Sequence, residues 1–213
     1  MKTLAQIKEE GRMPTIDEIR DFYEDIATPR ESDGWFGSTQ HIEAGFGRVQ
    51  FCLEHIEEGM SVLELGCADG GVLKHLAKAA GNGYVCGVDI SPTFVQKAAK
   101  YVPKADVVVA DACTYQTRRR FDVVVVTEVM EHVPDPRQLL ANAYGLLRKG
   151  TGKLLITVPV DWDDALGEHL HNFEAKDVAV IIGDATGLHV PIEQRGDNFY
   201  AVVDKRNNVP YVP

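Results

Sequence analysis

Cysteines are few in this sequence and lie far apart. The four among its 213 residues, Cys52, Cys67, Cys86 and Cys113, form no CxxC pair. The spacing typical of zinc sites, redox motifs and disulfide-rich secreted domains is therefore missing. We expect four free thiols that pack as small, half-buried side chains in a reducing compartment.

Long hydrophobic runs are also missing. No apolar segment approaches the length of about 20 residues that a membrane-spanning helix needs. The first residues, MKTLAQIKEEGR, are charged and do not resemble a secretory leader. These features predict a cytoplasmic protein without a transmembrane segment.

Positive charge is scarce. Lysine and arginine number 22 against 32 aspartates and glutamates, which gives a formal net charge of −10. Proteins that hold duplex nucleic acid usually carry a basic face, and the run Arg118–Arg120 is more typical of a solvated loop. A small molecule is therefore the expected partner rather than nucleic acid, and the oligomeric state is left open.

Internal repeats and low-complexity segments are missing too, whereas hydrophobic residues make up 45% of the chain. That share is enough for one α/β domain with a core of its own. Short apolar runs alternate with helical patterns, and the runs expected to form strands are Val62–Leu65, Tyr84–Asp89, Asp106–Ala110, Phe121–Thr127 and Lys153–Val158. This alternation predicts a doubly wound, mostly parallel sheet that binds ligands at the carboxyl ends of its strands.

The two ends of the chain depart from this alternation. Two strand-like runs, Leu188–Glu193 and Asn198–Val203, are separated by too few residues for a parallel crossover. We therefore expect an antiparallel terminal hairpin, which brings the sheet to seven strands. We expect residues 1–45 to form a helical cap or lid and residues 46–213 to form the ligand-binding domain. Together they are expected to make one compact domain.

The most informative segment is Val62–Gly71, VLELGCADGG, in which a short apolar strand ends in a Gly-rich turn. An apolar-periodic helical pattern starts directly after the turn, at Val72. Glycine lets the backbone approach a ligand closely, and the N-terminus of the following helix offers N–H groups to an anionic group. The segment therefore predicts a site for a nucleotide-like ligand.

Two classes of cofactor use such a turn. As G-x-A-x-x-G, with Asp89 about 20 residues further on, it approximates the dinucleotide fingerprint of an NAD-dependent oxidoreductase. As G-x-A-x-G after Glu64, it resembles the motif of class I S-adenosylmethionine-dependent methyltransferases. A second acid, Asp111, directly after the third strand, and the terminal hairpin favour the methyltransferase. A Tyr–Lys pair one helical turn apart, typical of short-chain dehydrogenases, is missing.

The resemblance covers most of the chain and implies a site for S-adenosylmethionine. Its second specific stretch, Thr127–Pro136 (TEVMEHVPDP), is similar to the ubiquinone-biosynthesis O-methyltransferases and related small-molecule methyltransferases. The resemblance implies that Asp89 accepts hydrogen bonds from the ribose hydroxyls and that Asp111 accepts one from the adenine amino group. It also implies that Glu64 faces the methionine amino group. Ala68 replaces the middle glycine, which its methyl group permits if φ is negative there. The full implied cofactor set is Arg48, Glu64, Gly66, Cys67, Ala68, Gly70, Asp89, Ile90, Asp111, Ala112 and Thr127.

His132 is the candidate catalytic residue. It follows the fourth expected strand, at the edge of the sheet where ligands bind. An imidazole with an ordinary pKa near 6.5 suits a general base that takes a proton from a hydroxyl acceptor. The structural alternative is a histidine at a helix start whose ring bonds only to backbone.

A denser cluster surrounds His132. Together with Glu128 and Glu131 it resembles a divalent-metal site of the ubiquinone O-methyltransferases, which makes magnesium a candidate cofactor. The segment around His169 and His171 offers a further ligand. The alternative is that the two glutamates brace the loop by hydrogen bonds, while the two histidines line a polar substrate mouth.

The acceptor is expected to be small. The loop after the fifth strand is short, and the residues that we assign to the substrate side are Tyr23, Trp35, Phe36, Trp162, His169 and His171. Such a pocket suits a hydroxylated metabolite, a sugar or a phenol, and favours O-methylation. The alternative from another class is an inactive module that binds S-adenosylmethionine and serves as a partner protein.

Overall fold

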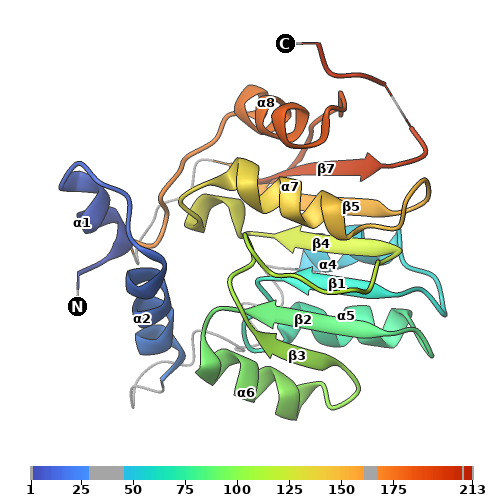
Figure 1. Cartoon of the computed structure of the whole chain (residues 1–213), viewed down its shortest axis with the longest axis horizontal. Helices are drawn as coiled ribbons and strands as arrows, with labels where there is room; N and C mark the ends of the chain where they lie inside the picture. The colour runs from blue at the N-terminus through green and yellow to red at the C-terminus, as the bar shows by residue number, and fades with distance from the viewer. Residues whose placement is uncertain (1, 29–45, 161–166, 208, 213) are drawn as a thin grey trace.

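The computed structural model describes residues 2–28, 46–160, 167–207 and 209–212. Seven strands form one sheet in the order β3-β2-β1-β4-β5-β7-β6 (Figure 1). The strands are β1 (Val62–Leu65), β2 (Val85–Asp89), β3 (Asp106–Val109), β4 (Val123–Thr127), β5 (Lys153–Pro159), β6 (Glu193–Arg195) and β7 (Asn198–Asp204).

The strand directions confirm the expected fold class. The pairs β1–β2, β1–β4, β2–β3 and β4–β5 are parallel, whereas β5–β7 and β6–β7 are antiparallel. The sheet is therefore mostly parallel and closes with an antiparallel hairpin. Every residue of β4 is buried, because helices cover both faces of a parallel sheet.

The predicted bounds of the first hairpin strand were wrong. We expected Leu188–Glu193, but β6 covers only Glu193–Arg195. Pro191 has no N–H to donate to a strand partner, so pairing with β7 begins after it. The preceding residues pair with the C-terminal segment instead, since the N–H of His189 donates to the carbonyl of Val209 over 2.9 Å.

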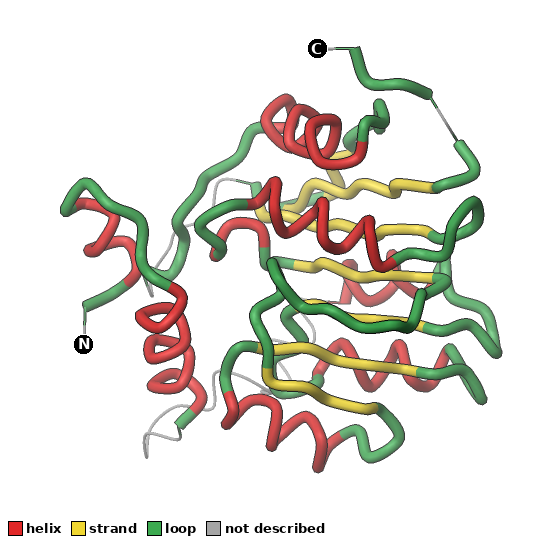
Figure 2. Tube along the Cα trace, in the orientation of Figure 1, coloured by secondary structure: helices red, strands yellow, loops and turns green. Residues whose placement is uncertain are grey.

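Helices flank the sheet and begin where the sequence offers caps. Ser91 and Asp135 each cap a helix that has proline at its first position, as the sequence indicates. The helices are α1 (Leu4–Glu9), α2 (Ile16–Ala27), α4 (Phe46–Leu53), α5 (Gly71–Ala79), α6 (Pro92–Tyr101), α7 (Pro136–Leu146) and α8 (Ala175–Thr186), with a 3-10 turn η1 (Met130–His132). The connection from β3 to β4 contains no helix and is drawn wholly as loop in Figure 2.

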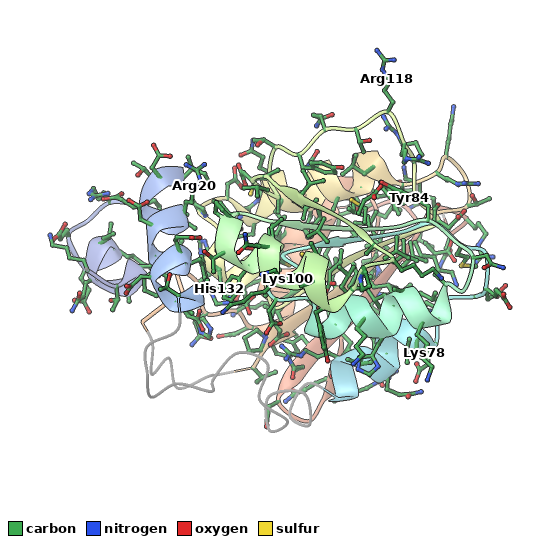
Figure 3. All side chains as sticks on the ribbon, turned by 90° about the horizontal axis from the view of Figure 1, so that it is seen from below. Arg20, Lys78, Tyr84, Lys100, Arg118 and His132 are labelled. Carbon is green, nitrogen blue, oxygen red and sulfur yellow. The ribbon has the colours of Figure 1, made fainter. Side chains whose placement is uncertain are left out.

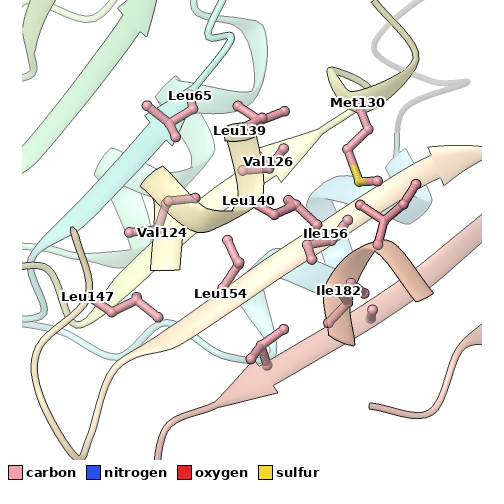
Figure 4. Close-up of a cluster of buried hydrophobic side chains, with 14 of the residues drawn as sticks. Leu65, Val124, Val126, Met130, Leu139, Leu140, Leu147, Leu154, Ile156 and Ile182 are labelled. Atoms are coloured by element: carbon pink, nitrogen blue, oxygen red, sulfur yellow. The ribbon is translucent and has the colours of Figure 1, made fainter. Parts of the chain in front are cut away.

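The core lies in two layers, one on each face of the sheet. On one face, side chains of α7 and α8 such as Leu140 and Ile182 pack on Val124, Val126 and their neighbours (Figure 4). On the other face, α4, α5 and α6 pack against the alternate side chains of the same strands. All four cysteines are free, as expected, but they are buried rather than half-buried.

The carboxyl ends of the parallel strands all meet at one edge of the sheet. In Figure 1 the arrowheads of β1, β2 and β4 point toward the side on which α2 stands. A small separate cluster of apolar side chains joins α1 and α2 to Ile90, directly after β2, and to Leu170. The two N-terminal helices therefore stand over the edge of the sheet where a doubly wound fold binds its ligand. In the part of the chain that the structure describes, no helix combines the length and apolar character needed to cross a membrane.

Candidate active site

A cavity of about 510 Å³ opens at the carboxyl edge of the sheet. This volume lies within the range of small-molecule sites, roughly 300–1,000 Å³. Most of the residues predicted from the sequence line it: Tyr23, Arg48, Glu64, Gly66, Cys67, Ala68, Asp89, Ile90, Asp111, Ala112, Thr127, Glu128, Glu131, His132 and His169. Trp35, Phe36 and Trp162, assigned to the substrate side, lie outside the described residues.

The Gly-rich turn connects β1 to α5 and forms one wall of the cavity. Gly66 has φ +79°, and a Cβ built there would lie 2.4 Å from Cγ2 of Val129. No side chain fits at this position, so glycine is required by both conformation and space.

The condition of a negative φ at Ala68 is not met, because Ala68 has φ +43°. Its N–H donates to Oδ2 of Asp89 over 2.9 Å, and this hydrogen bond accompanies the left-handed conformation. A left-handed conformation costs an L-residue about 1–2 kcal/mol. The turn therefore carries local strain beside the half-buried carboxylate of Asp89.

Gly70 has a packing role at the start of α5. It has φ +90° and does not line the cavity. A Cβ there would lie 3.2 Å from Cα of Ala98, so glycine allows the start of α5 to pack closely on α6. The contact of Gly70 with the methionine part of a cofactor stays a prediction.

Asp89 ends β2 and is held by the backbone on both sides. Oδ2 accepts the N–H of Ala68, and Oδ1 accepts the N–H of Ser91 over 3.0 Å. Burial raises the pKa of Asp89, although these backbone hydrogen bonds oppose the rise. Each oxygen has a second lone pair, so the carboxylate retains the capacity to accept two further donors.

Asp111 occupies the equivalent place beside β3. Its Oδ1 accepts the N–H of Cys113 over 2.9 Å, and its Oδ2 accepts the hydroxyl of Thr114 over 3.1 Å. Like Asp89, it is a strand-end carboxylate fixed by neighbouring residues and facing the cavity.

Glu64 is a buried acid in the middle of the sheet. It is 2% exposed, and its Oε2 has no hydrogen-bond partner among the described residues. Burial, together with the negative charge of Asp89, raises the pKa of Glu64 to about 8, while Arg48 opposes the rise. A buried oxygen without a donor is costly, which makes Glu64 a candidate to receive a donor from a ligand.

Glu128 braces the loop that follows β4. Its Oε1 accepts hydrogen bonds from the hydroxyl of Thr157 over 2.7 Å and from Nδ2 of Asn198 over 2.8 Å. Its Oε2 lies 3.2 Å from the guanidinium of Arg48. The ligand atoms that lie close enough together for one ion are those of Glu131, His132 and His169, so the structure does not bring Glu128 into the predicted trio.

Glu131 contrasts with Glu128. It is 1% exposed, and neither carboxylate oxygen accepts a hydrogen bond from the described residues. Burial, reinforced by the charge of Glu128, raises the pKa of Glu131 well above its usual range. Its backbone carbonyl accepts the N–H groups of Leu170 and His171 over 2.7 and 3.1 Å, which fixes the segment after β5 against η1.

His132 lies between Glu131 and the segment after β5. Its Nδ1 is 3.3 Å from the carbonyl oxygen of Glu168, and its Nε2 is 3.5 Å from Oε1 of Glu131. The ring stands 4.9 Å from that of His169 and 6.0 Å from that of Tyr23, measured between centroids. Figure 3 shows His132 beside α2. Ligand atoms of Glu131, His132 and His169 all lie within 4.8 Å of one another.

Two further residues of the substrate side differ in their placement. The hydroxyl of Tyr23 is 3.5 Å from Oε2 of Glu168, and burial followed by the charge of Glu168 raises the pKa of Tyr23. His171 does not line the cavity, and its assignment to the substrate side stays a prediction. Its Nε2 lies 2.9 Å from the carbonyl of Val133 and its ring stacks on Phe173, on the far side of the segment.

Comparison with known proteins identifies the family. A family model described as a methyltransferase domain matches residues 40–188, which is more than half of the chain. The chain belongs to the S-adenosylmethionine-dependent methyltransferase family. This assignment decides between the two cofactor classes that the Gly-rich turn left open.

Curated relatives of this methyltransferase differ in their acceptors. It is 30% identical over 115 residues to a ubiquinone biosynthesis O-methyltransferase of Coxiella burnetii, covering 49% of this chain and 48% of that protein. It is also 30% identical over 116 residues to a trans-aconitate 2-methyltransferase of Methylobacterium radiotolerans, covering 54% and 43%. The chain thus matches about half the length of these relatives.

Solved structures agree on the fold of the methyltransferase. The N-methyltransferase NodS of Bradyrhizobium japonicum, in complex with S-adenosyl-L-homocysteine, has a TM-score of 0.66 and 21% identity, covering 86% of this chain and 96% of that chain. Magnesium protoporphyrin IX methyltransferase of Synechocystis, with bound S-adenosylhomocysteine, has a TM-score of 0.65 and 18% identity with the same coverage. At such low identity these likenesses show the fold alone.

Several residues of the site were missed in the sequence. Val129 limits the space at Gly66, while Thr157 and Asn198 orient Glu128. Glu24 of α2 bonds to the start of α6. These contacts join residues up to 70 positions apart, so no local pattern indicates them.

Proposed function

We propose that this methyltransferase transfers the methyl group of S-adenosylmethionine to a hydroxyl group of a small molecule, with His132 accepting the hydroxyl proton. The observation that carries the proposal is the position of His132. Its ring lines the same cavity as the strand-end acids Glu64, Asp89 and Asp111. A base and a cofactor site therefore share one enclosed space, as group transfer requires.

The cofactor assignment rests on the fit of the cavity lining. Asp89 would accept the two ribose hydroxyls, and Asp111, with the N–H of Ala112, would bind the adenine edge. Ile90 would pack on the adenine ring, and Thr127 would offer its backbone carbonyl to the methionine amino group. The unpartnered, buried Oε2 of Glu64 supports this fit, because an ammonium group would supply the donor that Glu64 lacks. When bound, S-adenosylmethionine supplies a methyl group carried on a positively charged sulfur.

The tautomer of His132 follows from its neighbours. A backbone carbonyl can only accept, so Nδ1, which faces the carbonyl of Glu168, carries the proton in the neutral ring. Nε2 then presents its lone pair on the side of Glu131. An acceptor hydroxyl that reaches Nε2 would give up its proton there. The positive ring would in turn favour ionisation of Glu131, whose pKa is otherwise raised, and the resulting ion pair would stabilise the charged ring.

The acceptor class is inferred from the surrounding side chains. Tyr23 from α2 and His169 from the segment after β5 enclose His132 with polar, ring-shaped groups. These suit a small hydroxylated ring, a phenol or a sugar. The ubiquinone biosynthesis relative, named as an O-methyltransferase, supports oxygen as the accepting atom.

A divalent metal is the second candidate for this part of the site. The three grouped ligands Glu131, His132 and His169 combine a carboxylate and two imidazoles, a donor set that binds several divalent ions. The unpartnered oxygens of Glu131 fit this role. A metal would assist by lowering the pKa of a hydroxyl bound to it. The two roles compete, because a metal on His132 would occupy the nitrogen that a base needs.

The test is methyl transfer to matched acceptors. Catechol, its dimethyl ether 1,2-dimethoxybenzene and the amine benzylamine are incubated with purified protein and methyl-labelled S-adenosylmethionine. We expect label in catechol, none in the ether, which has no free hydroxyl, and none in the amine. Transfer to the amine alone would contradict O-methylation. No transfer across a wider set of hydroxylated metabolites, with binding of S-adenosylhomocysteine intact, would favour the inactive module.

Chelation separates the base from the metal. The same reaction is followed after exhaustive dialysis against EDTA and again after adding back magnesium, manganese or zinc. Full activity after dialysis would eliminate the metal. If activity is lost on dialysis and recovers when one ion is added, Glu131, His132 and His169 would be assigned as ligands of that ion. His132 would then not be the general base.

A further inference from the structure

Glu24 links the N-terminal helices to the cofactor side of the cavity. It lies on α2, one residue after Tyr23, and its carboxylate turns toward the start of α6. Oε2 accepts the hydroxyl of Ser91 over 2.6 Å and the N–H of Thr93 over 3.2 Å. Oε1 accepts the hydroxyl of Thr93. One side chain thus receives three hydrogen bonds from the first turn of another helix.

These contacts satisfy a need of α6. The first N–H groups of a helix have no partner within the helix, and a carboxylate is favoured there by the helix dipole. Ser91 already caps the N–H of Phe94 through its Oγ, over 3.1 Å. Glu24 takes the N–H of Thr93 and also the proton of the Ser91 hydroxyl. The cap of α6 is therefore completed from a helix 67 residues away in sequence.

The same serine holds Asp89. The N–H of Ser91 donates to Oδ1 of Asp89, so hydrogen bonds run from Glu24 through Ser91 to the carboxylate that faces the cavity. Fixing the hydroxyl of Ser91 restricts this turn and with it the direction of the Asp89 oxygens.

A second attachment keeps α2 beside α6. Lys97 donates from Nζ to the carbonyl of Ala27, at the C-terminal end of α2, over 2.6 Å. Ile90 packs on the apolar cluster that contains Ile19 and Phe22 of α2. Ile19 itself lines the cavity, so the docked helix is also a wall of the site.

We propose that Glu24 is a positioning residue for the cofactor: by binding Ser91 and Thr93 from α2, it couples docking of the N-terminal helices to the formation of the ribose site at Asp89. The inference rests on the assignment of Asp89 in the proposed function. Cofactor binding and docking of α2 then favour each other, since both stabilise the same turn.

The test compares Glu24→Gln with Asp21→Asn, an exposed carboxylate on the same helix that loses the same charge. Affinity for S-adenosylhomocysteine is measured by calorimetry. Glutamine keeps the length of the side chain but loses the charge and one acceptor, so we expect affinity to fall about tenfold. Asp21→Asn should stay within twofold. Turnover at saturating S-adenosylmethionine should change less than affinity does, because Glu24 does not touch the acceptor.

Hydrogen exchange supplies a readout that a purely structural role would not move. In the wild-type chain, S-adenosylhomocysteine should slow exchange of the amides of α2, residues 16–27. In Glu24→Gln this additional protection should be lost. Equal protection by S-adenosylhomocysteine in both proteins would overturn the coupling role of Glu24. Unchanged affinity for S-adenosylhomocysteine in Glu24→Gln, with weak binding in Asp89→Ala, would also overturn that role and would leave the ribose assignment intact. Unchanged affinity in Asp89→Ala would refute the ribose assignment and this proposal together.

Discussion

The cavity has two halves that are built differently. On the half that we propose binds the cofactor (the cofactor half), the strand-end acid Asp89 receives two backbone N–H groups, over 2.9 and 3.0 Å. On the half that we propose binds the acceptor (the acceptor half), Glu131 is more deeply buried than Asp89, yet neither of its oxygens accepts a hydrogen bond from the described residues. One carboxylate is held in place, whereas the other keeps its full capacity for a proton, a metal or a substrate donor.

The sequence separation of the contacts explains this difference. Asp89 is fixed by residues two and 21 positions away, within one strand–turn–helix unit. The acceptor half joins Tyr23 to Glu168, 145 residues apart, and His132 to Glu168, 36 residues apart. A local unit can fix its own carboxylate while it folds, but the acceptor half exists only after distant segments have packed together.

The strongest test of the comparison is His132→Ala. We expect turnover to fall about 100- to 10,000-fold, because a general base contributes that much, while affinity for S-adenosylhomocysteine changes less than about twofold. Steady-state kinetics and calorimetry measure the two effects. His171→Ala is the matched control, since His171 lies outside the cavity and its loss should leave turnover within about threefold. Equal losses in both variants would remove His132 as the base.

The reverse result is expected for Asp89→Ala. Loss of a charged acceptor for two ribose hydroxyls should weaken binding of S-adenosylhomocysteine about 10- to 100-fold, with a smaller change in turnover at saturation. Asp106→Ala, which removes an exposed carboxylate at the opposite end of the neighbouring strand, should bind normally. If both variants bind S-adenosylhomocysteine normally by calorimetry, Asp89 does not bind the cofactor, and the proposed cofactor half of the cavity is refuted.

Glu64 should make the ligand-free protein less stable as pH rises. Its pKa is raised to about 8 in the folded chain, so the folded state keeps a proton that the unfolded chain has lost above its ordinary value of 4.5. Stability is then fully present below pH 4.5 and falls toward pH 8, by at most about 1.4 kcal/mol per pH unit. Glu64→Gln should flatten this slope in urea unfolding at several pH values. Parallel curves for the two proteins would show that Glu64 is ionised in the folded state.

The smallest expected effect concerns Ala68. Glycine tolerates φ +43° without the cost of about 1–2 kcal/mol that alanine meets, but loses about 0.5–1 kcal/mol in chain entropy. Ala68→Gly should therefore raise the free energy of unfolding by about 0.5 kcal/mol. Ala141→Gly, at an exposed position inside α7, should lower it by about 0.5–1 kcal/mol. A loss of stability in both variants would mean that the turn at Ala68 is not strained.

Much of the fold could be predicted because its signals are local. Buried runs such as Phe121–Thr127, and caps such as Asp135 before Pro136, act over a few residues. The hairpin was predicted, but the start of β6 was not. Whether Pro191 interrupts the pairing of a strand depends on which strand lies beside it, and the sequence does not show this. Gly70 was assigned to the ligand because the sequence does not show that Ala98 packs against it.

The amino-acid sequence was enough to predict the alternation of strands and helices, the Gly-rich turn and the acids at the strand ends, since each of these depends on neighbouring residues and on the regular geometry of a parallel sheet. Which of the acids are engaged by other side chains depends on the tertiary structure. Thr157, Asn198 and Arg48 contact the oxygens of Glu128, while no described residue donates a hydrogen bond to those of Glu131. The two glutamates stand three positions apart in the sequence, but burial and hydrogen bonding depend on segments that only the folded chain brings together.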